Sequence, residues 1–153
     1  MFIAANNLHY GMDFCPAFWD WLVQTNQGGK VFSIEKVKDE LEAGDDELAN
    51  WASAQGDRFF LRPDETVIQA MGRVSNWVNN NGYTTPAKNA FFQGADYWLI
   101  AHALAGRFVV VTHEKPAATR TRVKIPNVCV GLGIKVMTPF EMLRHERARF
   151  VLK

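Results

Sequence analysis

Three acidic residues lie where an α/β protein usually places its chemistry. Glu114 comes two residues after the apolar run FVVVT at 108–112, and Asp96 begins a long apolar segment. Glu40 lies in a helix-forming acidic segment. In a parallel sheet, sites form outside the carboxyl ends of the strands, so acids just after a strand or at the start of the next helix are the candidates for chemistry.

Each of the first two acids also has a purely structural interpretation. Glu114 can be a solvated loop glutamate. Asp96 must lie at the amino end of its helix, because the rest of the segment is too apolar to carry an acid, and there it can serve as a capping aspartate. Both interpretations stay open at the level of the sequence.

Glu40 is selected by helix geometry. At about 100° per residue, it lies a quarter-turn from the apolar face of its expected helix, which is formed by Ile34, Val37 and Leu41. Glu40 can therefore flank the core. Glu42 flanks it almost as well.

Elements of two kinds must position these acids. The pattern predicts short strands that alternate with helices, so we expect an α/β fold with a mostly parallel sheet. Expected strands are 31–34, 58–61, 108–112 and 134–137. Expected helices are 16–27, 34–44 with Ser33 as a cap, 45–55, 63–77, 85–93, 95–106, 125–133 and 138–146.

Length and composition predict one globular domain over residues 1–153. The chain has 153 residues, of which 48% are hydrophobic, enough for one sizeable core. The two cysteines are far apart and form no zinc pattern, and both are expected to be buried. No run is long and apolar enough for a membrane span, and no signal peptide is visible, so we expect a cytoplasmic protein.

Charge is unevenly distributed along the chain. Residues 1–65 hold 5 Lys/Arg against 12 Asp/Glu, and residues 66–153 hold 12 against 4. The acidic and basic halves can complement one another, or the basic half can face a polyanion.

Several long segments, in order along nearly the whole chain, resemble a PIN-like family of bacterial proteins related to VapC-type toxins. They are MDFCPAFWDWL, FSIEKVKDELEAGDDELANWA, GADYWLIAHALA, FVVVTHE, VKIPNVC and TPFEMLRHERARFVL. The resemblance implies a three-layer α/β sandwich with helices on both faces of the sheet. It also implies a toxin of a toxin–antitoxin system, with RNA as substrate and an antitoxin protein as partner.

The resemblance further implies a Mg²⁺- or Mn²⁺-dependent endoribonuclease, a hydrolase that cuts RNA with an activated water. Glu40 matches the acid of the family's DEL segment, Asp96 that of GAD and Glu114 the acid after VVT, so all three are expected to be catalytic metal ligands. Hard divalent cations favour carboxylate oxygens and keep several waters.

The start of the chain departs from the family pattern. Related sequences open with a short apolar strand that ends in Asp-Ala-Asn, whereas residues 1–7 resemble the segment after it. We therefore expect the first strand and its aspartate to be missing, activity to be impaired, and two chains to pair as a homodimer over the uncovered strands. A gene start placed too late is the other explanation.

Residues around Glu114 are expected to contact RNA. His113 is a candidate for orienting a phosphate or water, and the basic side chains can meet the RNA backbone. The basic residues are Lys115, Arg120, Arg122 and Lys124. An alternative function is a non-catalytic, oligomeric PIN-like protein that binds RNA or an antitoxin without cutting.

Overall fold

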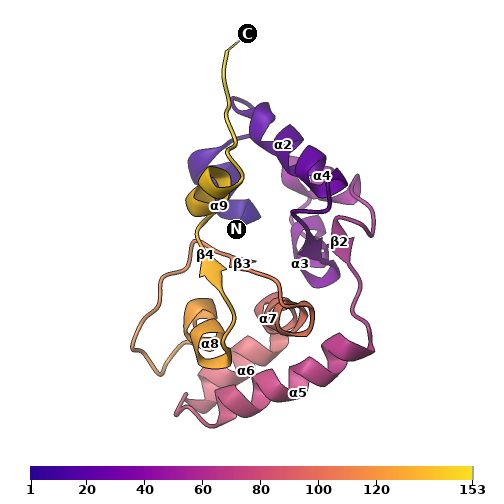
Figure 1. The fold of residues 1–153 in the computed structure, drawn as a ribbon. Helices are drawn as coiled ribbons and strands as arrows, with labels where there is room; N and C mark the ends of the chain where they lie inside the picture. The colour runs from indigo at the N-terminus through magenta and orange to yellow at the C-terminus, as the bar shows by residue number, and fades with distance from the viewer. Residues whose placement is uncertain (153) are drawn as a thin grey trace. The chain divides into compact units, whose positions relative to one another are not determined.

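A computed structural model describes residues 1–152 of the chain. The chain divides into two compact units (Figure 1). Unit 1 consists of Met1–Arg62 and Pro139–Lys153, and unit 2 of Pro63–Thr138. Helices and short strands occur in both units, so the protein is mixed α/β, as predicted.

Unit 1 combines helices with one pair of parallel strands. Ser33 of β1 is in register with Phe60 of β2. Helix α3 packs against α4 and against both strands. The elements are α1 (Phe2–Ala4), the π-helix η1 (Ala5–His9), α2 (Pro16–Gln27), β1 (Ser33–Ile34), α3 (Glu35–Glu42), α4 (Glu47–Ser53), β2 (Phe60–Leu61) and α9 (Pro139–His145).

Aromatic rings fill much of the core of unit 1. Phe18 is fully buried, and its ring stacks on Tyr10 with the centroids 4.4 Å apart. Trp19 meets the ring of Phe18 edge-on at 5.3 Å and that of Trp51 at 4.9 Å. These buried rings explain why α2 forms a stable helix, because its apolar side covers a large hydrophobic area.

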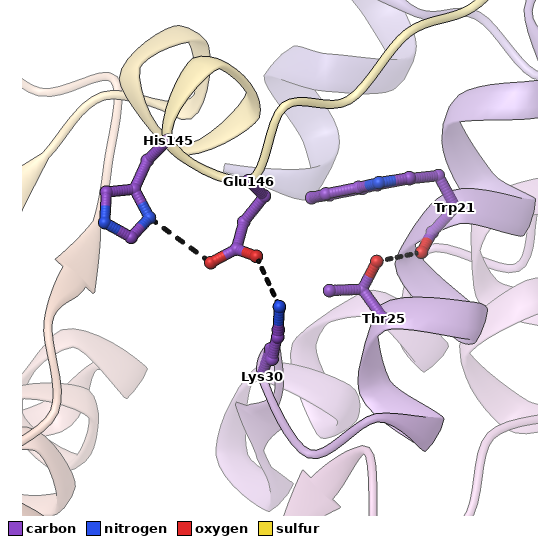
Figure 2. Close-up of polar contacts among 5 residues, drawn as sticks. All are labelled: Trp21, Thr25, Lys30, His145 and Glu146. Carbon is purple, nitrogen blue, oxygen red and sulfur yellow. Dashed lines mark hydrogen bonds and ion pairs between the residues drawn. The ribbon is translucent and has the colours of Figure 1, made fainter.

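A hydrogen-bonded cluster fixes the carboxyl-terminal segment within unit 1 (Figure 2). Lys30 Nζ lies 3.3 Å from one oxygen of Glu146, and His145 Nδ1 lies 3.3 Å from the other. Burial opposes ionisation of Glu146, but the hydrogen bonds from Lys30 and His145 outweigh it, so the pKa of this carboxyl lies below its ordinary value. Nearby, the hydroxyl of Thr25 donates to the carbonyl of Trp21 at 2.6 Å.

Unit 2 is built mainly from helices around one apolar core. Helix α5 packs against α6, α7 and α8, and residues such as Val74, Ile100 and Val128 are fully buried between them. These helices form the magenta-to-orange part of Figure 1. The elements are α5 (Glu65–Asn79), α6 (Thr85–Gln93), α7 (Ala95–Gly106), β3 (Val110–Val111), α8 (Ile125–Leu132) and β4 (Val136–Met137).

Most expected helices are confirmed, and several have the caps that their sequences suggest. Asp64 accepts from the N–H of Val67 at the start of α5, and Pro16 occupies the first turn of α2. One expected cap is wrong. Ser33 belongs to β1, and the residue before α3 is Ile34, which makes no side-chain cap hydrogen bond.

Strands are shorter than predicted, and they form two separate parallel pairs. Val110 of β3 is in register with Val136 of β4. The strand expected at 108–112 is reduced to Val110–Val111; Phe108 and Val109 are exposed, whereas Val110 and Thr112 are buried. Apolar content alone therefore overestimates the length and burial of this strand.

The two cysteines differ in their surroundings. Cys129 is fully buried in unit 2, and this burial raises the pKa of its thiol to about 12. Cys15 is half-buried, so the expectation that both are buried is correct only for Cys129. Within residues 1–152, no helix combines the length and the apolar character that crossing a membrane requires.

Candidate functional site

Asp96 lies in the first turn of α7, as the sequence predicts. The helix begins after Gly94 without a side-chain cap, and an acid in the first turn is favoured by the positive end of the helix dipole. Asp96 is half-buried and lines a cavity of about 310 Å³ in unit 2. The other walls come from α6 and from residues 121–123. Asp96 therefore faces a space that a ligand could enter.

Glu114 closes the loop between β3 and α8. One carboxylate oxygen accepts from the backbone N–H of Ile125 at 2.8 Å, and the other accepts from Arg122 Nη2 at 3.2 Å. Its own N–H donates to Thr112 Oγ1 at 3.1 Å. Since Lys124 provides no side-chain cap, Glu114 satisfies a backbone donor at the start of α8. The side chain is not a freely solvated loop glutamate, because only 19% of it is exposed.

Arg122 borders both the cavity and Glu114. Its guanidinium pairs with Glu114, and the same residue lines the cavity with Asp96. The side chain of Arg122 is 66% exposed, so the ion pair contributes little to stability and can exchange partners.

The residues expected to contact RNA lie on the loop that Glu114 closes. Lys115, Arg120 and Arg122 are exposed and Lys124 is half-buried. Arg120 is also held over the ring of Tyr83, 5.7 Å from its centroid. Burial raises the pKa of the Tyr83 hydroxyl, although Arg120 opposes the shift, so the phenol stays neutral near pH 7. The loop is an exposed cationic surface.

Glu40 belongs to unit 1, whereas Asp96 and Glu114 belong to unit 2. It lies on α3 and is exposed, with its neighbour Leu41 buried. Glu42 pairs with Lys38, at 3.7 Å between Oε1 and Nζ. Two of the three expected acids, Asp96 and Glu114, therefore lie in the same unit.

The carboxylates of Asp96 and Glu114 are of the chemical type that hard divalent cations bind. Among residues 1–152, no group of three or more His, Cys, Asp or Glu side chains is arranged to hold a metal ion. Mg²⁺ commonly uses only one or two carboxylates and completes its shell with waters and substrate phosphates. Asp96 and Glu114 supply two such groups. The oxygens of Glu114 each keep a further lone pair beside the hydrogen bonds from Arg122 and Ile125.

Sequence reasoning did not identify the cavity itself. Its apolar walls include Ala87 and Phe91 of α6, together with Val123, and it also contains Thr121. Residues of α6 carry no signal for a site, since their pattern is that of an ordinary packed helix. His102 is buried in α7.

Helices and parallel strand pairs define the chain as a mixed α/β protein with an acid-lined cavity beside a basic loop. It belongs to the DUF4411 family, described as a domain of unknown function, whose family model matches residues 1–150. No curated protein and no solved structure matches the chain.

Proposed function

We propose that the protein is a metal-dependent endoribonuclease of the PIN-like class, with the three-layer fold of that class and a relationship to VapC-type toxins. The observation that carries the proposal is the position of Asp96. Asp96 lines the 310 Å³ cavity together with Arg122, and the guanidinium of Arg122 donates a hydrogen bond to Glu114. Carboxylates beside a cationic surface are what cleavage of a polyanion requires, because the substrate must be attracted and a cation must be held.

Asp96 and Glu114, which both belong to unit 2, would hold Mg²⁺ or Mn²⁺. When bound, such a cation lowers the pKa of a coordinated water and shields charge that develops on the phosphate. Glu114 has a second task, because its hydrogen bonds to Arg122 and Ile125 set the conformation of the basic loop.

The basic loop would bind the RNA backbone on either side of the cleaved bond. Lys115, Arg120 and Lys124 provide positive charge without a fixed sequence preference, and His113 orients a phosphate or water. An antitoxin protein and a second copy of the chain are further partners in this proposal.

A second candidate function is RNA or antitoxin binding without cleavage. It is favoured by the hydrogen bonds of Glu114, since both carboxylate oxygens already accept from protein groups. On this alternative Glu114 is a loop-closing residue, and the basic loop alone carries the interaction.

Substitution of Asp96 by Asn distinguishes metal-dependent RNA cleavage from binding without cleavage. We expect the wild-type protein to cut single-stranded RNA with Mn²⁺ and not with EDTA, and Asp96→Asn to lower the rate by about a hundredfold or more, because one charged ligand is lost. The measurement is the initial rate of cleavage of an end-labelled RNA.

Glu65→Gln is the matched control for this assay. Glu65 also lies in the first turn of a helix of unit 2 and is exposed, so its substitution removes the same kind of charge away from the cavity. Its rate should equal that of the wild type. Cleavage that persists in EDTA, or that Asp96→Asn leaves unchanged, would overturn the proposal. Retention of RNA without any cleavage would favour the second candidate.

A further inference from the structure

The cavity beside Asp96 is lined by both apolar and polar residues. Pro86, Ala87 and Phe91 of α6 provide apolar surface, and Thr121 and Arg122 provide a hydroxyl and a guanidinium. Phe91 and Ala87 are buried, so this part of the lining belongs to the packed core of unit 2. The hollow is therefore lined partly by side chains fixed by that core.

Size restricts what the cavity can take. A volume of about 310 Å³ lies at the small end of ligand sites, which suits one planar ring system with a short polar attachment. The apolar α6 wall, to which Pro86 and Ala90 contribute exposed side chains, favours the flat face of a nucleobase over a charged group.

Charge restricts the occupant further. Arg122 lines the cavity, and Arg120 and Lys124 are its neighbours on the same loop. A guanidinium has five N–H donors, and the pair with Glu114 involves Nη2. Arg122 can therefore bind a phosphate while it keeps Glu114 in place.

We propose that this cavity binds one nucleotide of single-stranded RNA, with the base against the α6 wall and the phosphate at Arg122. The inference rests on the proposed function and adds the place where the strand is held. Bases in a duplex are stacked and cannot enter such a pocket, so the site selects single-stranded RNA.

Asp96 gives the proposal a distinctive consequence. Its carboxylate lies on the wall of the same cavity and repels an anionic nucleotide when no cation is present. In EDTA, Asp96→Asn should therefore bind a nucleotide at least as tightly as the wild type does. The same substitution should abolish cleavage in Mn²⁺, so it should remove cleavage while nucleotide binding is retained.

The test is titration of the whole protein with adenosine 5′-monophosphate in EDTA, followed by NMR. Ala90→Trp fills the cavity from an exposed position on α6, and Arg122→Gln removes the phosphate contact. Each should weaken binding by about tenfold, which corresponds to the loss of one charge-assisted hydrogen bond or of one stacked base.

Two controls keep the result specific. Asn89→Trp places the same ring at the adjacent exposed position of α6, and Arg73→Gln removes an exposed arginine from α5; neither residue lines the cavity. Both should bind as the wild type does. Thermal unfolding of all four variants shows whether each is folded.

Absence of nucleotide binding by the wild type would overturn the proposal, and so would an equal loss in the control variants. RNA cleavage in Mn²⁺ without nucleotide binding would remove this inference and leave the proposed function intact. Nucleotide binding without RNA cleavage would support this inference and remove the proposed nuclease function.

Discussion

Phe18→Ala is expected to lower the free energy of unfolding by about 3–5 kcal/mol, the usual cost of removing a fully buried phenylalanine. Phe18 has no exposed surface, and its ring contacts Tyr10, Trp19 and Phe150. These partners lie on α2 and in segments from both ends of the chain. The cavity left by the substitution would therefore loosen the packing of several parts of unit 1 at once. Urea denaturation followed by circular dichroism measures the effect.

Phe14 offers a control with the same side chain. It lies four positions earlier, and it is 70% exposed. Phe14→Ala should change the free energy of unfolding by no more than about 0.5 kcal/mol, as is usual for surface substitutions. Equal losses from both variants would contradict the packing described for unit 1.

Gly131→Ala is expected to destabilise unit 2 by about 1–3 kcal/mol, which is typical of overpacking. A Cβ atom at this position of α8 would overlap the indole ring of Trp77 on α5. The ring is large and half-buried, so it cannot move aside without disturbing the contact between the two helices. Thermal or urea unfolding measures the loss.

Gly72→Ala should raise the free energy of unfolding, in contrast to Gly131→Ala. Gly72 lies in the interior of α5, and a Cβ there meets nothing within 4 Å. Because glycine weakens a helix by about 0.5–1 kcal/mol relative to alanine, this variant should be more stable than the wild type.

Adding Trp77→Leu to Gly131→Ala should recover part of the stability, since the smaller side chain leaves room for the methyl group. A Gly131→Ala protein as stable as the wild type would refute the close approach of α8 to Trp77.

Local signals in the sequence predicted most of the helices. Pro16 fits the first turn of α2, and the apolar length of 95–106 gives α7 with Asp96 at its amino end. Such signals act over a few residues, so they need no knowledge of the rest of the chain. The sequence overestimates the strand lengths, because strand pairing depends on partners elsewhere in the chain. Val110 pairs with Val136, and a loop and a helix separate the two residues in the sequence.

Side-chain roles that depend on tertiary contacts could not be read from the sequence. Glu114 was placed correctly just after β3, but its partners Arg122 and Ile125 lie 8 and 11 residues further along the chain. Loop conformation alone brings them together. The cavity likewise combines residues of α6 with Thr121 and Val123, and no pattern connects these segments.

Asp96 and Glu114 are proposed to hold a divalent cation, and titration of the metal-free protein with Mn²⁺ measures whether they do. Electron paramagnetic resonance of the free ion should show one saturable site in the wild type. Asp96→Asn and Glu114→Gln should each weaken it by at least about tenfold, since a carboxylate ligand is lost, and Glu65→Gln should leave it unchanged. No saturable binding by the wild type, or equal binding by all four proteins, would contradict the claim.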